Sequence, residues 1–270
     1  MRRASLMMTA LAVGLMVTGS AWGVHTFQKM ENFSSDPGWD ATGNTPGDGL
    51  GQDFGFSNTN NAGAAAGEAG GIIGRTGTSG SNPSAPVAYY AADLGGTIDF
   101  NHPFSASGRI FLQDQANTTN AFLGFFDSNN ACFSSQCSGP SVAGWLVDFA
   151  STYMVWDGPG GGSWEKSAGF PTTERGLLDW SFSYDPDAGT NGEISGTLGT
   201  IVVAPTDISA FVRGSGATFD RFGIAGGTDT NFGSTGPAYI DDVTYTAIPE
   251  PAIAGLLACG GLMLFRRRRA

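Results

Sequence analysis

Histidine, cysteine and positive charge are all scarce in this chain, which has 2 His, 3 Cys and 13 Lys and Arg among 270 residues. His25 lies near the amino terminus and His102 precedes Pro103, so neither forms a recognisable Ser-His or Cys-His motif for nucleophilic catalysis. No predicted strand carries closely spaced glutamates, although glycoside hydrolysis needs two carboxyl groups facing one cleft. We therefore expect a protein that is not an enzyme. The alternative is a glycoside hydrolase whose catalytic pair consists of two aspartates or of carboxyl groups that are far apart in sequence.

Helix-period apolar patterns are nearly absent between the two ends of the chain, whereas glycine is abundant, with 42 residues. This composition is typical of short strands joined by tight turns. The segments with the clearest strand pattern are 97–100, 109–113, 121–127, 144–149, 152–157, 177–184, 193–198, 200–204, 219–225 and 238–246. In one of them Trp180, Phe182 and Tyr184 alternate with polar residues, as in a half-buried strand. We predict one all-β domain over residues 24–247, a two-sheet antiparallel β-sandwich.

The domain is strongly acidic. Residues 24–248 carry 7 Lys and Arg against 23 Asp and Glu, a net charge of −16. Such a surface repels nucleic acid and anionic lipid head groups, so we exclude both as partners unless cations bridge them. Calcium is the cation that this surface would most readily recruit. The alternative is that the acidity serves solubility alone and has no partner.

The amino-terminal segment has the order of a secretory signal. Arg2 and Arg3 precede an apolar run over residues 6–17, and small residues at Ala21 and Gly23 suit cleavage by a signal peptidase after Gly23. We therefore assign residues 1–23 to a signal peptide and expect export. A first transmembrane helix is the alternative, but the apolar run is short for one.

The carboxyl-terminal segment, residues 248–270, combines three features in a fixed order. Pro249, Glu250 and Pro251 are followed by an apolar run over residues 252–265 and then by Arg266, Arg267, Arg268 and Arg269. The prolines keep the first part extended, and the arginines retain their end of a membrane helix on the cytoplasmic side. The apolar run is about 21 Å long as a helix, which is short against a hydrocarbon core of ~30 Å.

This tail resembles the PEP-CTERM sorting signal of bacterial exported proteins. The resemblance implies that the tail anchors the precursor in the inner membrane until an exosortase-type enzyme processes it near Pro249, Glu250 and Pro251. It also implies a final location at the cell surface or outside the cell. A tail anchor that is never cut is the alternative.

Two further segments, 181–199 and 218–247, resemble the concanavalin A-like, LamG-type jelly roll. In related carbohydrate-binding modules a structural calcium often lies between the first strand and the aspartates of the last strand. The resemblance thus implies Asp241, and less directly Glu31, as calcium ligands, because calcium takes carboxylate oxygens. Alternatively, Asp241 and Asp242 face solvent or cap a turn.

Tryptophans and cysteines supply the remaining candidates. Trp156 and Trp164 lie at a strand end and after a glycine-rich loop, so we expect them to be exposed, either stacking on sugar rings or packing the loop. Cys132 and Cys137 are expected to form a disulfide, because export takes the chain to an oxidising compartment.

The sequence as a whole predicts an exported, non-catalytic surface or extracellular-matrix protein that associates with exopolysaccharide. A lectin-like glycan-binding module is the alternative.

Overall fold

The structure of the protein is a computed structural model that describes residues 27–44, 46, 52–73, 87–113, 121–130, 140–147, 151–160, 165–171, 174–227 and 237–247. In these ranges the chain forms strands and one short helix. The elements are β1 (Phe27–Glu31), β2 (Asp40–Thr42), β3 (Phe54–Ser57), β4 (Glu68–Ile72), β5 (Val87–Asp99), β6 (Phe104–Leu112), β7 (Ala121–Phe126), β8 (Val142–Val147), β9 (Ser151–Asp157), β10 (Glu165–Lys166), β11 (Phe170–Pro171), β12 (Gly176–Asp185), β13 (Glu193–Leu198), β14 (Ile201–Asp207), α1 (Ala210–Gly214), β15 (Thr218–Gly227) and β16 (Pro237–Ala247).

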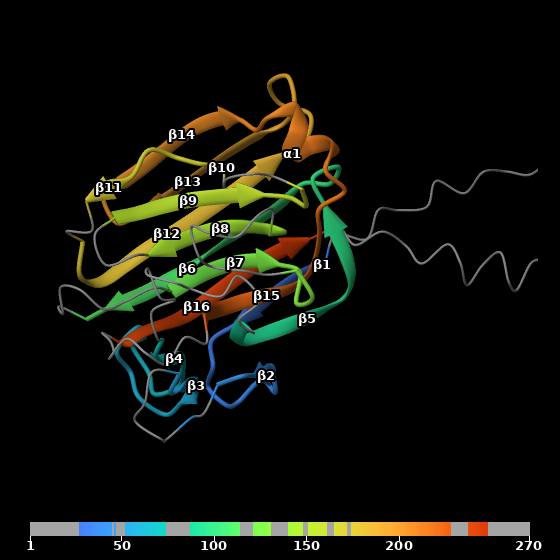
Figure 1. Cartoon of the computed structure of the whole chain (residues 1–270). Coiled ribbons are helices and arrows are strands. Elements are labelled where there is room, and N and C mark those ends of the chain that lie inside the picture. Colours follow the sequence, from blue (N-terminus) through green and yellow to red (C-terminus); the bar gives the residue numbers. More distant parts are fainter. Residues whose placement is uncertain are drawn as a thin grey trace, which may run out of the picture.

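The strands form two antiparallel sheets that stack face to face (Figure 1). Sheet A has the strand order β14-β13-β12-β6-β16-β4-β3, and β1 also pairs with β16. Sheet B has the order β10-β9-β8-β7-β15-β5-β2, and β11 also pairs with β9. Neighbours such as β6 and β16 are far apart in sequence, so most of the pairing is long-range. The all-β, two-sheet sandwich predicted from the sequence is confirmed, and its arrangement is jelly-roll-like.

The core lies between the two sheets and is rich in aromatic side chains. Trp180, Phe182 and Tyr184 of β12 all point into it, as their alternation with polar residues predicts. Phe222 of β15 stacks on Tyr245 of β16 with ring centroids 4.4 Å apart, which joins the sheets directly. Burying each large apolar side chain contributes on the order of 1.5–3 kcal/mol, so this cluster supplies much of the driving force for folding.

The outward faces of the two sheets differ in character. On sheet B a second apolar cluster lies on the side away from the main core and is buried: Tyr89, Ala91, Phe122, Phe126, Val142, Leu146, Val155 and Ala225. On sheet A the outward residues of β12 and β13 are mainly polar and at least partly exposed. Sheet A therefore offers water a polar face that sheet B does not.

A bulge in β16 sets which residues of that strand face outward. The register with β6 shifts between Asp241 and Thr244, and Asp242 has a φ of 50°. Asp tolerates this left-handed conformation better than most residues do. A Cβ at Gly108 of β6 would lie 3.1 Å from the Asp241 carbonyl oxygen, so glycine permits this close approach. Beyond the bulge, Thr244 and Thr246 face outward while Val243, Tyr245 and Ala247 are buried.

Several local predictions from the sequence agree with this structure. All ten predicted strand segments overlap observed strands. Trp180 is in the core, as its alternation with polar residues predicts, and Trp145 of β8 is in the core as well. No helix in the described part of the chain is long and apolar enough to cross a membrane.

Candidate functional site

Four neighbouring strands of sheet A repeat one three-residue pattern, in which Ser or Thr flanks a single central residue. The four copies are Ser105-Ala106-Ser107 in β6, Ser181-Phe182-Ser183 in β12, Ser195-Gly196-Thr197 in β13 and Thr244-Tyr245-Thr246 in β16. Because side chains alternate along a strand, the central residue points to the core and its two neighbours point outward. The polar face of sheet A therefore carries eight hydroxyl groups from these four strands.

The strand register aligns these hydroxyls in two rows across the sheet. The first hydroxyl row is Thr197, Ser181, Ser107 and Thr244; the second is Ser195, Ser183, Ser105 and Thr246. Neighbouring strands lie ~4.8 Å apart, so each row is about 14 Å long. Within the rows, Ser181 Oγ lies 2.9 Å from Thr197 Oγ1, and Ser183 Oγ lies 3.3 Å from Ser195 Oγ. Hydrogen bonds across the strands thus orient some of the hydroxyls.

An open groove of about 540 Å³ follows these rows. All eight hydroxyl-bearing residues line the groove, together with Gln28 of β1 and Val202 of β14. Its described lining contains no Asp, Glu, His, Lys, Arg, Cys or Tyr. Hydroxyl and amide groups both donate and accept hydrogen bonds, but they do not exchange protons readily at neutral pH. The described lining of the groove therefore offers groups that donate and accept hydrogen bonds.

Exposed apolar side chains stand at both ends of the first hydroxyl row. Val202 of β14 pairs with Thr197, and Met30 of β1 pairs with Thr244. Their exposed fractions, 63% for Val202 and 77% for Met30, are large for apolar side chains. Gln28 extends the second row in the same way, because it pairs with Thr246. A ligand lying along the rows would meet polar groups at its middle and apolar contacts at its ends.

Charged residues border the hydroxyl rows on both sides. Beyond the second row lies the acidic row of Asp185, Glu193 and Asp207, in register on β12, β13 and β14. Beyond the first row lies the charged row of Asp179, Arg109 and Asp241, in register on β12, β6 and β16. Arg109 is paired with the carboxylate of Asp242. Both borders of the groove therefore bear carboxyl groups.

Glu68, the first residue of β4, is fully buried and holds the 58–67 loop against sheet A. Its Oε1 accepts hydrogen bonds from Thr59 Oγ1 and, at 2.7 Å, from Asn61 Nδ2, and its Oε2 accepts one from the Ala62 backbone N–H at 2.6 Å. Ala69 of β4 pairs with Ile240 of β16, so Glu68 lies close to Asp241, and its charge acts on that carboxyl group. The sequence alone does not single out Glu68, because an isolated glutamate in a glycine- and alanine-rich stretch forms no recognisable motif.

Asp241 lies under the same loop and is 4% exposed. Its Oδ1 accepts the Asp242 backbone N–H at 2.7 Å, and a Cβ placed on Gly63 would come within 1.8 Å of its Oδ2. Burial raises the pKa of Asp241, while the hydrogen bond from Asp242 opposes that rise and the nearby charges of Asp242 and Glu68 add to it. A buried carboxyl group of this kind is closed off from a large ligand.

The two predicted calcium ligands lie on opposite sides of the bulge in β16. Glu31 of β1 pairs with Val243, beyond the bulge, and its Oε1 lies 2.6 Å from Lys29 Nζ. Asp241 lies before the bulge, next to Glu68 rather than Glu31. Within the described residues, no group of three or more His, Cys, Asp or Glu is arranged to hold a metal ion. The calcium site stays a prediction.

The expectation that Trp156 is exposed is wrong. Its ring is 3% exposed within the main core, and its Nε1 donates to Glu165 Oε2 at 3.0 Å. Glu165 Oε2 also accepts the backbone N–H of Ser209, which caps α1. Trp156 faces inward because it alternates with outward residues in β9. Its position at the end of a strand, on which the expectation of exposure rests, does not indicate which way the side chain points. Its ring is therefore not available to stack on a sugar.

Other predicted site residues lie outside the described residues. They are Trp164, Cys132 and Cys137, and in the tail Pro249, Glu250, Pro251, Arg266, Arg267, Arg268 and Arg269. The signal peptide, the disulfide and the sorting signal accordingly remain predictions.

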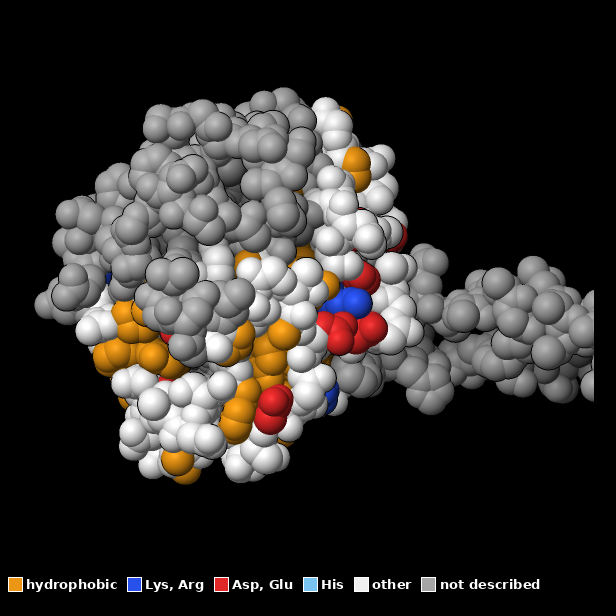
Figure 2. Space-filling model, turned by 60° about the horizontal axis from the view of Figure 1, so that its bottom comes forward, with side chains coloured by type: hydrophobic (Ala, Val, Ile, Leu, Met, Phe, Trp, Pro, Cys, Tyr) orange, Lys and Arg blue, Asp and Glu red, His pale blue; other side chains and the backbone are white. Residues whose placement is uncertain are grey.

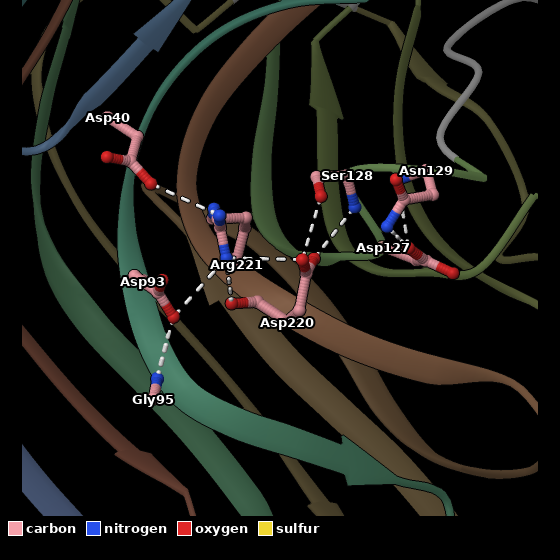
Figure 3. A network of polar contacts seen from close by, with 8 residues as sticks. All are labelled: Asp40, Asp93, Gly95, Asp127, Ser128, Asn129, Asp220 and Arg221. Atoms are coloured by element: carbon pink, nitrogen blue, oxygen red, sulfur yellow. Dashed lines mark hydrogen bonds and ion pairs between the residues drawn. The ribbon is translucent and has the colours of Figure 1, made fainter.

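Sheet B carries a second polar network around Arg221 of β15 (Figure 3). The guanidinium group of Arg221 lies 3.2 Å from Asp40 Oδ2, 3.3 Å from Asp93 Oδ1 and 3.1 Å from Asp220 Oδ2. Asp220 in turn accepts the backbone N–H and the hydroxyl of Ser128, which ties the turn after β7 to β15. On the face shown in Figure 2, one basic group lies between acidic side chains, and the basic side chains in view form no patch of their own. We therefore interpret this network as structural, because it joins β2, β5, β15 and the turn after β7.

Comparisons with known proteins support the fold. No protein-family model matches the chain, and no curated protein matches it in sequence. Among solved structures, a peanut lectin in complex with a 9-residue peptide is similar with a TM-score of 0.50 and 10% identity, covering 82% of this chain and 97% of the lectin. An endo-β-1,4-glucuronan lyase from Trichoderma reesei has a TM-score of 0.49 and 11% identity over 81% of this chain and 94% of its own. A Bacteroides ovatus GH16 protein in complex with a G4G4G3G product has a TM-score of 0.47 and 13% identity, covering 82% of this chain and 99% of the GH16 protein.

At these identities the similarity to peanut lectin establishes the fold alone. The described domain is an all-β, jelly-roll-like sandwich whose sheet A presents a groove lined with hydroxyl groups.

Proposed function

We propose that the protein binds a polysaccharide chain along the hydroxyl rows of sheet A and does not catalyse its cleavage. The observation that carries this proposal is the groove of about 540 Å³ whose described lining holds eight aligned hydroxyls and no titratable side chain. Sugar hydroxyls pair well with Ser, Thr and Gln, and the ends of the first row add apolar contacts for ring faces. The similarity to a lectin fold is compatible with this role.

The groove's length also suits a chain better than a single sugar. From β14 to β1 the first row crosses six strands, about 24 Å at ~4.8 Å per strand spacing. A polymer can make the same modest hydrogen bonds repeatedly along such a row. Each contributes on the order of 1 kcal/mol, so useful affinity would come from their number.

Removing the hydroxyls of the first row tests this function. The variant carries Thr197→Val, Ser181→Ala, Ser107→Ala and Thr244→Val, which keep the shape of each side chain close to the original. We expect at least ~10-fold weaker binding, because four hydrogen bonds of on the order of 1 kcal/mol are lost. Affinity electrophoresis in gels containing xyloglucan, mixed-linkage glucan, laminarin or galactomannan measures the change.

The control variant carries Ser34→Ala and Thr42→Val, which remove the exposed hydroxyl groups of the segment after β1 and of β2, neither of which lines the groove. It should bind like the wild type. Equal binding by the wild type and the groove variant would show that the groove is not the site. Release of reducing ends from any of these polysaccharides would instead establish an enzyme.

We further propose that this binding takes place after export, at the cell surface or in the extracellular matrix. Support comes from the sequence alone: the signal-peptide pattern of residues 1–23 and the PEP-CTERM-like order of residues 248–270. Exosortase-type processing near Pro249, Glu250 and Pro251 would release the domain from its membrane tail. A domain that binds polysaccharide would then be in contact with the polysaccharides outside the cell.

Intact mass of the mature protein tests the sorting route. In the wild type we expect loss of both terminal segments, and in Glu250→Ala we expect the carboxyl-terminal segment to remain, because the processing enzyme reads the Pro-Glu-Pro sequence. Mass spectrometry of envelope and medium fractions measures both. A wild-type tail that is intact in every fraction would contradict processing and leave a tail-anchored protein.

A further inference from the structure

We propose that the groove selects uncharged polysaccharides, and that the acidic row of Asp185, Glu193 and Asp207 excludes polyanionic ones. This inference rests on the proposed function, since it names the class of polymer that the same groove takes. The acidic row lies in register on three adjacent strands and continues the outward face that bears the hydroxyls. It is therefore part of the surface that an approaching chain meets.

The acidic row is close enough to act on a chain in the groove. Asp185 is two residues from Ser183 along β12, and Glu193 is two residues from Ser195 along β13. Two residues of a strand span about 7 Å. That distance is within the Debye length of ~8 Å at physiological ionic strength, so the carboxylates would repel an anionic ligand.

No ion pair of the described residues includes a carboxyl group of the acidic row. The ion pairs of the described chain involve Lys29, His102, Arg109 and Arg221, and none of them reaches Asp185, Glu193 or Asp207. Asp185 and Asp207 do accept backbone N–H groups of the 185–192 turn, from Asp187 at 2.9 Å and from Thr190 at 2.7 Å. These bonds hold the two carboxyl groups in place at the groove's edge.

The opposite border reinforces the same preference. Arg109 is the cation of the charged row, and its guanidinium is already paired with Asp242. Asp179 is exposed beside it on β12. An anionic chain would thus find carboxylates on both sides of the hydroxyl rows and no unpaired cation among the described residues between them, whereas a neutral chain needs only hydrogen bonds.

Pairs of polymers that share a backbone, one member neutral or less charged and the other anionic, test this inference. The pairs are hydroxyethyl cellulose with carboxymethyl cellulose, methyl-esterified pectin with its de-esterified form, and dextran with dextran sulfate. For any pair whose neutral member binds, we expect the anionic member to bind on the order of tenfold more weakly at low salt. Raising the ionic strength should narrow that gap, because salt screens repulsion.

The double variant Asp185→Asn, Glu193→Gln assigns the effect to the acidic row. Asn at position 185 keeps the oxygen that accepts the Asp187 N–H, and the side chain of Glu193 makes no hydrogen bond that the variant would break among those of the described residues. We expect the variant to keep neutral binding and to bind the anionic partners several-fold better than the wild type. The control Asp93→Asn, Asp127→Asn makes the same charge change on sheet B and should leave the gap unchanged.

The outcomes separate this inference from the proposed function. Equal binding of neutral and anionic partners by the wild type would overturn charge selection while leaving polysaccharide binding intact. A gap that persists unchanged in the Asp185, Glu193 variant would overturn the role of the acidic row. Failure to bind any of these polymers, or any in the uncharged panel used for the groove variant, would overturn the proposed function and this inference with it.

Discussion

Replacing Glu68 with alanine is expected to lower the free energy of unfolding by about 3 kcal/mol. The change leaves the hydroxyl of Thr59, the amide of Asn61 and the backbone N–H of Ala62 without their shared acceptor. Each buried donor left without a partner lowers the free energy of unfolding by about 1–3 kcal/mol, and the loop would have several such donors. Thermal and urea unfolding measure the loss, which corresponds to roughly 6–12 °C in Tm for a domain of this size.

The loop itself supplies a second readout of the Glu68 variant. Because the carboxyl group ties residues 59–62 to β4, limited proteolysis should cut the 58–67 segment faster in Glu68→Ala than in the wild type. The control Glu193→Ala removes a carboxyl group that is partly exposed and should change stability by no more than about 0.5 kcal/mol. A Glu68 variant with unchanged Tm and proteolysis would show that the loop is held by other contacts.

Asp157→Asn is expected to stabilise the protein at neutral pH by about 2 kcal/mol. Asp157, at the end of β9, is 1% exposed, and its Oδ2 has no hydrogen-bond partner among the described residues. Burial raises the pKa of Asp157 to about 6, against the opposing effect of the hydrogen bond from Gly158 N–H and with a smaller contribution from the charge of Glu165. One pKa unit corresponds to about 1.4 kcal/mol, and the new amide offsets part of the gain.

The sign of the pH dependence follows from the raised pKa. Between about pH 4 and pH 6 the folded state binds more protons at Asp157 than the unfolded state does, so this residue's contribution to stability falls as pH rises. The gain from Asp157→Asn should therefore be small at pH 4, grow up to about pH 6 and then level off. Urea unfolding across that range measures it.

Asp187→Asn is the matched control for Asp157→Asn, because it makes the same substitution at an exposed position in the turn after β12. It should show no comparable gain at neutral pH. A difference between wild type and Asp157→Asn that stays constant from pH 4 to pH 7.5 would contradict a buried, titrating carboxyl group at this position.

Strand positions were predictable because burial leaves a period of two in the sequence. In β12 the alternation of Trp180, Phe182 and Tyr184 with Asp179, Ser181 and Ser183 identifies both the strand and its two faces. The β12–β13 hairpin was also predictable from the sequence, because residues 185–192 contain Pro186 and two glycines, which are typical of a turn. In the structure both glycines, at positions 189 and 192, have a positive φ. Local chemistry suffices for these features.

The groove was not predictable, although each of its strands carries a visible Ser or Thr pair. The four copies of the pattern lie between residues 105 and 246, and only the pairing of β13, β12, β6 and β16 brings them side by side. The bulge at Asp242 then decides that Thr244 and Thr246 face the same way as the other hydroxyls. A one-residue change of register would turn them to the core.

Aromatic and carboxyl candidates were harder to place from the sequence than hydroxyls. Trp156 was expected in contact with solvent and is in the core, where Glu165 satisfies its indole N–H. The resemblance places Asp241 with Glu31, whereas the pairing of Ile240 with Ala69 leaves Asp241 close to Glu68, whose charge acts on it. In each case the deciding neighbour comes from a segment that sequence spacing does not relate to the residue.

The sequence by itself determined the all-β class, the positions of ten strand segments, the core aromatics of β12 and the acidity, because these depend on composition and on a period of two along each strand. Tertiary structure alone decided which outward face stays polar, how the hydroxyls align and which carboxyl groups border them. The physical reason is that register and strand order are set by long-range pairing and by the fit of side chains in one shared core.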